Sequence, residues 1–536
     1  MSRVVVVGSG ASGVHFALSL LRKGLDVTMI DVGRGGTHDI APHANFTALK
    51  RELDDPAGYF LGERYEGVLL PGSAGEYYGI PPSKGYVFTG PDDLRHAGTG
   101  FEPLLSFARG GLAEAWTAGC YPLNEGETAD FPFCHQQIAE QYEEVARRIG
   151  ITGAEDDLAP FMPLHGHLLP PLRLDAHSEQ LLAVYDRKRA RLNRGLGVYM
   201  GRTRVATLTR ALGSRGACEY LGRCLWGCPV GALYTPSHTL AECQTFDGFE
   251  YVTGARVEYF TTGAGNRVRS VVVQPVGGGA HQEIAVDYLA LAAGTLMSSS
   301  IVLESVLRST GERVELHGLM DNRQVLVPFF NLRMLGRSAS PDTYQYHLLG
   351  LGLPASDPRE YVHAQLTTLK TALLHPIIQR LPLDLQTATY LTRVVRAGLG
   401  VVNVNFRDTR RAQNYLTLSA GSGAGGRTLE LHYCPDADEG VRMRDALRKI
   451  AAALRALGCI IPPGMTHVRP MGASVHYAGT LPMSREAAPF TTTEHCQSRD
   501  YPNLFIVDGS TFPFLPAKNI TFTLMANAVR VAEAAF

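Results

Sequence analysis

The chain has 536 residues, and at roughly 100–200 residues per domain this length accommodates about three to four units or two large interlocked domains. Lys plus Arg number 50 against 51 for Asp plus Glu, with no basic stripe and no terminal charge block, which argues against a nucleic-acid partner. Hydrophobic residues are 45% of the chain, but no uninterrupted apolar run approaches the roughly 18 residues of a membrane span, so we expect a soluble protein.

The N-terminal segment predicts a βαβ unit. RVVVV at residues 3–7 forms a strand, a helix runs from residue 11 to about residue 23, and a second strand covers residues 26–31. Because the first strand starts directly after the initiator methionine, it leaves no room for a signal peptide, and we expect a cytoplasmic protein. Nine cysteines without a secretion signal favour reduced thiols over a disulfide framework.

The glycine turn of this unit, GSGASG, has the spacing of a dinucleotide-binding fingerprint. Gly8 permits the tight turn, Gly10 lets the backbone approach a pyrophosphate, and Gly13 lets helix and strand pack closely, while Asp31 at the end of the second strand would accept hydrogen bonds from the ribose. A turn that serves only strand-to-helix packing is the alternative, and the motif does not separate FAD from NAD. The expected cofactor contacts here are Gly8, Ser9, Gly10, Ala11, Ser12, Gly13, Asp31 and Val32.

The sequence after the βαβ unit contains irregular, helical and alternating segments. From residue 32 to about residue 105, scattered Gly, Pro, Asp and Tyr predict long irregular excursions. Apolar residues recur at helical spacing over residues 134–149 and about 440–457. Alternating segments predict half-buried antiparallel strands. These segments are TYQYHLLG from Thr343, YVHAQL from Tyr361, VVNVNF from Val401 and TLEL near Leu429.

Three segments near the C-terminus carry a further signature: VHYAGTLPM with His476, NLFIVDGSTFPF with Asp508, and KNITFTLMANAVRVAEA with Asn519. Together with GSGASG they resemble the glucose-methanol-choline (GMC) flavin oxidoreductases. SFARGGLAEAWTAG resembles the glycine-rich flavin loop of that family, including pyranose oxidase-like members, and LALAAGTLMSSSIVLES resembles its strand-to-helix segment near the isoalloxazine. The resemblance implies FAD-dependent oxidation of an alcohol to a carbonyl, with a small-molecule alcohol as substrate and oxygen or another electron acceptor.

The resemblance also implies site residues. His476 would be the catalytic base and Asn519 its partner across the flavin, as in cholesterol oxidase-like members, because imidazole can take the alcohol proton while hydride leaves for flavin N5. A core histidine and a helix-capping Asn are the alternatives. Ile520 replaces the usual proline of the family, and Ala115 stands where pyranose oxidases attach their flavin, so noncovalent FAD is expected. Further implied contacts are Gly110, Gly111, Trp116, Thr117, Val257, Ala293, Gly294, Asp508, Gly509, Ile520 and Thr521.

The resemblance and the alternating strands together predict an α/β protein. A Rossmann-like FAD-binding domain would be assembled from residues 1–165, 200–316 and 471–536, and an α+β substrate domain built on an antiparallel sheet would cover residues 317–470, with a contribution from 166–199. If that sheet lies over the flavin, two polar pairs could contact a hydroxylated substrate such as a sugar, a cyclitol or a natural-product intermediate, although such residues more often face solvent. These pairs are His363 with Gln365 and Asn403 with Asn405.

A cysteine cluster leaves a different function open. Cys218, Cys224 and Cys228 lie within eleven positions, which permits an iron–sulfur cluster that relays electrons. Their spacing is looser than in most metal sites, and a loop without metal, similar to the Gly-Cys-Pro segment of bacterial family members, is the interpretation we favour. A non-redox family relative of the lyase or decarboxylase type and an NAD-dependent dehydrogenase also stay open.

Overall fold

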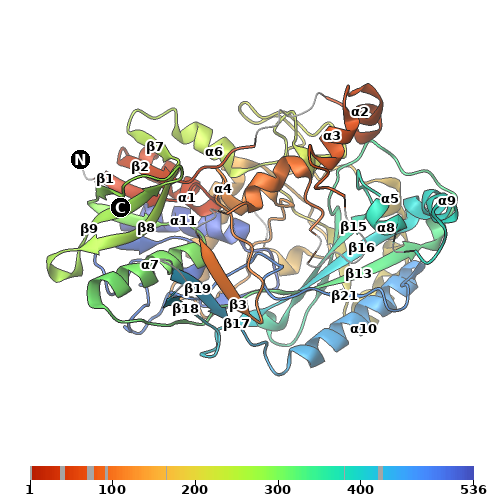
Figure 1. Ribbon diagram of the computed structural model, residues 1–536. Coiled ribbons are helices and arrows are strands. Elements are labelled where there is room, and N and C mark those ends of the chain that lie inside the picture. Colours follow the sequence, from red (N-terminus) through yellow and green to blue (C-terminus); the bar gives the residue numbers. More distant parts are fainter. Residues whose placement is uncertain are drawn as a thin grey trace.

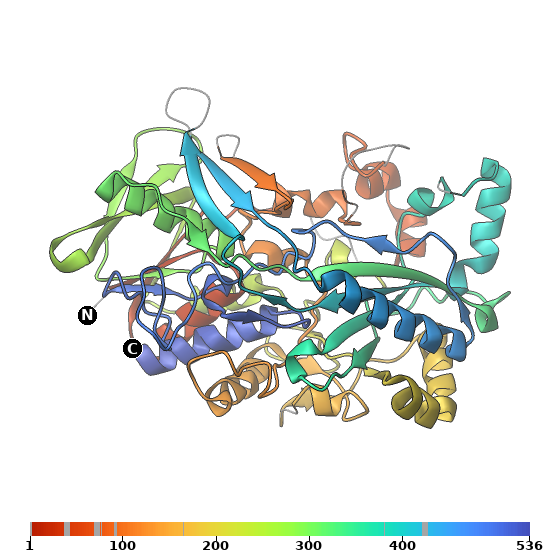
Figure 2. The ribbon, with the colours of Figure 1, turned by 90° about the horizontal axis from the view of Figure 1, so that it is seen from below.

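The computed structural model describes residues 3–36, 43–68, 76, 78–90, 94–163, 166–379, 381–420 and 427–536. Two large β-sheets lie at opposite ends of the molecule, a parallel one on the left of Figure 1 and an antiparallel one on the right. Both chain termini lie at the end that carries the parallel sheet, as the view from below also shows (Figure 2). The protein is therefore a mixed α/β structure, as the sequence predicts.

The N-terminal βαβ unit is confirmed. Strand β1 (Arg3–Val7), helix α1 (Ala11–Arg22) and strand β2 (Asp26–Asp31) follow one another as expected. The parallel sheet has the strand order β22-β11-β1-β2-β7. It therefore gathers strands from widely separated chain segments: β7 (Phe249–Thr253), β11 (Tyr288–Leu291) and β22 (Leu504–Ile506).

The central strand β1 is buried on both faces, which explains its unbroken run of β-branched valines. Val4 and Val6 belong to a core shared with α1, α4 (His135–Ile149) and α11 (Thr521–Ala535). Val5 and Val7 face a second core, to which α7 (Thr295–Thr310) contributes. Helices thus cover the sheet on one side, and α7 with a small antiparallel sheet covers it on the other. That small sheet is formed by β8 (Ala255–Thr262), β9 (Val268–Pro275) and β10 (Gln282–Ala285).

The large antiparallel sheet has the order β20-β13-β16-β15-β14-β6, and β21 also pairs with β13. Its apolar face packs against α5 (Ala176–Ala190) and α10 (Glu439–Leu457) in a third core. Along β13, burial alternates with a period of two, which separates this face from the opposite, polar one. The strands are β6 (Tyr199–Arg202), β13 (Arg323–Asn331), β14 (Leu349–Leu353), β15 (Val362–Thr368), β16 (Leu399–Phe406), β20 (Cys459–Ile460) and β21 (His467–Val468).

Smaller elements complete the fold. A four-stranded sheet runs in the order β12-β18-β19-β3 and packs into the core that contains α7. Its strands are β12 (Leu316–His317), β18 (Tyr415–Ala420), β19 (Arg427–His432) and β3 (Arg95–Thr99). The remaining elements are α2 (Phe46–Glu52), α3 (Pro56–Leu61), α6 (Pro236–Cys243), α8 (His375–Ile378), α9 (Leu385–Val395), β4 (Ile151–Thr152), β5 (Leu168–Leu169), β17 (Asp408–Thr409) and β23 (Phe514–Leu515).

Most predicted elements are confirmed, and one is largely wrong. The helices expected over residues 134–149 and about 440–457 are α4 and α10, and the strands expected near Tyr361, Val401 and Leu429 are β15, β16 and β19. The alternating segment from Thr343 becomes a strand only at Leu349. Tyr344 and Tyr346 are both buried in the same core, so the alternation here reflects burial without pairing to a neighbouring strand.

The irregular stretch between residues 32 and 105 also contains short helices, α2 and α3, and the strand β3. Parts of that stretch lie outside the described residues. Residue 165, the predicted end of the first FAD-binding segment, also lies outside them. Within the described residues, no helix combines the length and the apolar character that crossing a bilayer requires.

The contact between α1 and the loop after β1 gives a test of the fold. A Cβ added at Gly13 would lie 2.1 Å from the carbonyl oxygen of Gly8, so Gly13→Ala should separate helix and strand and lower the free energy of unfolding by about 1–3 kcal/mol. Gly195→Ala is the control, because its Cβ would meet no atom within 4 Å. Urea unfolding measures both, and equal stability of the two variants would contradict the packing role.

Candidate active site

A cavity opens beyond the carboxyl ends of β1, β2 and β11, the place where parallel sheets bind their ligands. Chain segments that are far apart in sequence meet around it. They include the glycine turn after β1, the loop at Phe107–Ala113, the start of α7 and the segment around His476. The predicted residues that line the cavity are Gly8, Ser9, Gly10, Ala11, Ser12, Asp31, Val32, Gly111, Val257, Ala293, Gly294, His476, Asp508, Gly509, Ile520 and Thr521.

Glycines leave room along this cavity. A Cβ at Gly10 or at Gly294 would meet no atom within 4 Å, so the backbone at both positions faces open space. Gly8 serves the turn itself, because it has φ of +100° and its Cβ would lie 2.6 Å from the carbonyl oxygen of Ala292. The glycine pattern therefore supplies both the turn and a backbone surface that a ligand can approach closely.

Two helices point their N-termini at the same cavity. Helix α1 begins after Gly10 and α11 begins after Ile520, and residues from both first turns line the cavity. Neither first turn contains an acidic residue, and neither N-cap side chain bonds to the helix backbone. Free N–H groups and the helix dipole make each N-terminus favourable for negative charge, so the cavity suits an anionic ligand.

Asp31 lies at the rim of the cavity. Its carboxylate accepts hydrogen bonds from the Ser9 hydroxyl and from the Ser9 backbone N–H, the latter at 3.3 Å. Burial raises the pKa of Asp31 to about 6, and the Ser9 contacts oppose this rise. The same Ser9 hydroxyl accepts the N–H of Gly110 at 2.9 Å, which ties the Gly110 loop to the fingerprint.

Other predicted residues lie outside the cavity lining. Trp116 donates its indole N–H to the carbonyl oxygen of Tyr234 at 2.7 Å and packs against the core that contains α1. Thr117 follows it, and Gly13 packs against Gly8. Asp508 lines the cavity, but its carboxylate is engaged by internal donors, the Ser298 hydroxyl at 2.5 Å and the Ser510 N–H at 3.0 Å.

His476 lines the cavity and meets Asn519, although the two residues lie 43 positions apart. The His476 ring is 7% exposed, and its Nε2 lies 3.3 Å from Nδ2 of Asn519. Its Nδ1 lies 3.1 Å from Oδ1 of Asn322. Burial, with a smaller contribution from the charge of Arg469, lowers the pKa of His476 to about 4. The ring is therefore neutral at physiological pH and able to accept a proton.

The polar face of the antiparallel sheet joins this pair. Strand pairing places His363 opposite Asn405 and Gln365 opposite Asn403, so all four side chains share one face. Gln365 donates its amide N–H to Oδ1 of Asn519 at 2.6 Å. Three buried polar atoms on this face have no partner among the described residues. They are Nε2 of His363, Oδ1 of Asn403 and Nδ2 of Asn405.

Sequence reasoning missed Lys518, the neighbour of Asn519. Lys518 is fully buried and forms an ion pair with the equally buried Glu127. Its ammonium also donates to the carbonyl oxygens of Pro122 at 3.0 Å and Phe161 at 2.5 Å, so all three of its protons are used. The pair anchors the loop that presents Asn519, and a lysine inside an otherwise apolar C-terminal segment was the signal that could have found it.

Sequence reasoning also missed Asn322 and Tyr121. Asn322 precedes β13 and holds the ring of His476. The hydroxyl of Tyr121 lies 3.4 Å from the Gln365 amide, and its ring lies 4.2 Å from that of His363. No local pattern marks either residue, because both act through strands that are distant in sequence.

The three cysteines of the predicted cluster pack against the hydrophobic core that contains α1. Cys218, Cys224 and Cys228 are free and half-buried. Burial raises the pKa of Cys218 to about 11 and raises the pKa of Cys224 further. Among the described residues, no three His, Cys, Asp or Glu side chains are grouped so that they could hold a metal ion.

Residues 410–528, which include His476 and Asn519, match the family model of the GMC oxidoreductases. The chain carries the C-terminal domain of a GMC oxidoreductase. The family resemblance stated from the sequence motifs is thereby confirmed, and the protein is an oxidoreductase enzyme.

Two relatives and one solved structure are similar to this chain over nearly its whole length. The chain is 24% identical to paromamine 6'-oxidase of Streptomyces fradiae, over 99% of its own length and 90% of that protein. It is 24% identical to C-glycoside 3-oxidase of Microbacterium trichothecenolyticum, over 99% and 95% of the two chains. The crystal structure of pyridoxine 4-oxidase from Mesorbium loti has the same fold, with a TM-score of 0.62, 16% identity and 99% of each chain covered.

The Lys518–Glu127 pair in this oxidoreductase gives a second test. Lys518→Met should lower the free energy of unfolding by about 3–5 kcal/mol, because it leaves a buried carboxylate without its counter-charge. The double variant Lys518→Met/Glu127→Leu should recover most of that loss, since no charge then stays buried. Urea unfolding of both single variants and the double variant measures this coupling, and strictly additive losses would argue against it.

Proposed function

We propose that this oxidoreductase holds FAD noncovalently in the cavity and oxidises a CH–OH group of a hydroxylated small molecule to a carbonyl. The observation that carries the proposal is the meeting of His476 and Asn519 beside a cavity with a glycine cradle and two helix N-termini. Oxygen or another electron acceptor would then reoxidise the flavin.

The cavity residues fit FAD. Members of the GMC family are generally FAD-dependent, and the open backbone at Gly10 with the N-terminus of α1 suits a pyrophosphate. Asp31, largely ionised at neutral pH, can accept hydrogen bonds from the ribose. The N-terminus of α11 at Ile520 and Thr521 would stabilise negative charge on the flavin ring. When bound, the flavin supplies the hydride acceptor, and the protein positions the carbon that gives up the hydride.

The neutral ring of His476 performs the proton step in this proposal. A lone pair on Nε2 would take the hydroxyl proton of the substrate as its C–H bond gives up hydride. Without substrate, Nε2 is in contact with the amide of Asn519. The substrate hydroxyl would replace this contact at Nε2, and the amide of Asn519 could then donate a hydrogen bond to the same oxygen. Both side chains are held from behind, His476 by Asn322 and Asn519 by Gln365, so little reorganisation is needed.

The sheet face beside this pair favours a substrate with several hydroxyl groups. Buried amide and imidazole atoms without partners are costly unless a ligand or water satisfies them. His363, Asn403 and Asn405 present both donors and acceptors, as a sugar or cyclitol would require. The relatives named paromamine 6'-oxidase and C-glycoside 3-oxidase support this class.

We also propose the domain division predicted from the sequence. The parallel sheet takes its strands from the segments 1–165, 200–316 and 471–536, and the antiparallel sheet takes most of its strands from 317–470. Strand β6 crosses the proposed boundary at residue 199, and the sheet containing β18 packs beside α7. The site would then lie where the two units meet.

An anaerobic absorbance scan tests the proposed function. The purified protein is titrated with sugars, cyclitols, sterols and simple alcohols while the flavin bands near roughly 450 nm are followed. We expect bleaching by polyhydroxylated compounds. A protein that stays colourless after addition of FAD would overturn the cofactor assignment.

Replacement of His476 tests its role in alcohol oxidation separately from the binding of FAD. His476→Ala should keep its FAD but lose alcohol oxidation by about 10²–10⁴-fold, the usual contribution of a positioned acid or base. His177→Ala is the control, because His177 is also buried but packs near Phe329 on the apolar face of the sheet. Stopped-flow flavin reduction is the measurement, and an unchanged rate in His476→Ala would exclude the assigned role.

The pH dependence follows from the pKa of about 4 for His476. Only the neutral ring accepts a proton, and because burial lowers the folded pKa, the ring stays neutral down to about pH 5. The acid limb of kcat/KM should therefore lie well below the ordinary histidine value of about 6.5. A limb at or above that value would show that the folded pKa is not lowered.

A further inference from the structure

The amide of Asn322 can be oriented in only one way. Asn322 lies between β12 and β13 and is 1% exposed. Its Nδ2 lies 2.8 Å from the carbonyl oxygen of Phe406 and 2.8 Å from that of Pro516. Carbonyl oxygens only accept, so both Nδ2 protons are committed to them, and Oδ1 is left as an acceptor.

This orientation fixes the proton on His476. Since Oδ1 of Asn322 can only accept, Nδ1 of His476, 3.1 Å away, must be the donor. In the neutral ring, Nε2 then carries the lone pair and must accept from Nδ2 of Asn519 at 3.3 Å. Oδ1 of Asn519 in turn accepts from Gln365 at 2.6 Å. Two backbone carbonyls thus set the direction of the whole hydrogen-bonded chain.

Asp321, the preceding residue, holds the backbone that carries this ring. Its carboxylate accepts the N–H of Gly472 at 2.5 Å and the hydroxyl of Ser474, whose oxygen accepts the N–H of His476 at 3.0 Å. Val475, between them, has a φ of +58°, a costly conformation for a β-branched residue. The contacts of Asp321 hold this turn in place.

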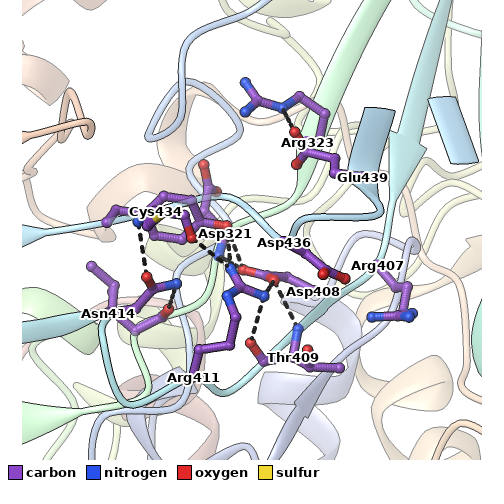
Figure 3. A network of polar contacts seen from close by, with 12 residues as sticks. Asp321, Arg323, Arg407, Asp408, Thr409, Arg411, Asn414, Cys434, Asp436 and Glu439 are labelled. Carbon is purple, nitrogen blue, oxygen red and sulfur yellow. Dashed lines mark hydrogen bonds and ion pairs between the residues drawn. The ribbon is translucent and has the colours of Figure 1, made fainter. Parts of the chain in front are cut away.

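Asp321 is itself anchored in a wider network (Figure 3). Its backbone N–H donates to Asp408 at 3.1 Å. Asp408 also accepts from the Arg411 guanidinium at 2.7 Å and from the Tyr433 hydroxyl at 2.7 Å. The support of the His476 turn therefore extends from the loop before β13 to the strand β17 at Asp408.

We propose that Asn322 is a positioning residue that selects the Nδ1–H tautomer of His476, while Asp321 holds the turn on which His476 sits. The inference rests on the proposed function, in which Nε2 is the atom that takes the substrate proton. With the other tautomer, Nε2 would carry a hydrogen and could not accept one. Asn322 does not line the cavity and would act through its contact with His476.

The tautomer can be observed directly. In the flavin-loaded protein labelled with ¹⁵N-histidine, two-bond proton–nitrogen NMR correlations show which ring nitrogen carries hydrogen, and His476→Gln identifies the signals of His476. We expect hydrogen on Nδ1 in the natural protein. Asn322→Leu, which removes the acceptor, should move hydrogen to Nε2 or give a mixture. Asn322→Asp in its protonated form keeps an oxygen that accepts from Nδ1 and an O–H that donates to one of the two carbonyls, so it should retain the natural pattern.

A matched control separates this role from general stability. Asn503 is equally buried, and its Nδ2 donates to the carbonyls of Val268 at 2.9 Å and Asp287 at 2.8 Å while its Oδ1 accepts the N–H of Val268. Asn503→Leu therefore loses the same kind of bonds but should leave His476 unchanged. Flavin reduction by the alcohol that bleaches the natural protein should slow about 10–100-fold in Asn322→Leu and be partly restored in Asn322→Asp.

Two results would overturn the inference: hydrogen on Nε2 in the natural protein, or an unchanged Nδ1–H pattern in Asn322→Leu. The first decides the matter even if Asn322→Leu does not fold. Failure of the proposed function is a separate result, because it would show as an unchanged rate in His476→Ala while the tautomer pattern still follows Asn322.

Discussion

A directional chain of hydrogen bonds runs from Asn322 through His476 and Asn519 to Gln365. It joins the antiparallel sheet to the loop before α11, a helix that shares a core with the parallel sheet. Buried polar groups must be paired, so each member constrains the next, and the chain holds one geometry. The candidate site depends on it, since Gln365 comes from the antiparallel sheet and Asn519 from the loop before α11. A shift of the antiparallel sheet against the loop before α11 would break the bond between Gln365 and Asn519.

The charges and dipoles around these hydrogen-bonded residues are consistent with the same candidate site. The uncapped N-termini of α1 and α11 make the cavity favourable for a negatively charged ligand. Beneath Asn519, the charge of Lys518 is neutralised by Glu127 and by two carbonyl oxygens, so the pair fixes the loop without adding net charge. Burial keeps His476 neutral. In the proposed function, the site would thus bind an anionic cofactor and accept a proton in adjoining places.

The antiparallel sheet divides two roles between its faces. One face packs against α5 and α10 and makes the third core, which gives the sheet its rigidity. The other carries His363, Gln365, Asn403 and Asn405, whose spacing is set by strand register. Because side chains alternate along a strand, the strands that build the core also fix where the polar groups stand.

Sequence alone determined the elements whose signal is local: the βαβ unit with its glycine turn, helices α4 and α10, and the alternating strands β15 and β16. Motif resemblance singled out His476 and Asn519, and the family followed from them. Tertiary structure alone decided that Tyr344 and Tyr346 are buried without forming part of a strand, and that Trp116 bonds to Tyr234. It also decided that Asn322, Lys518 and Glu127 support the candidate site. The physical reason is that these side chains act on partners from distant parts of the chain, and periodicity within a segment carries no information about them.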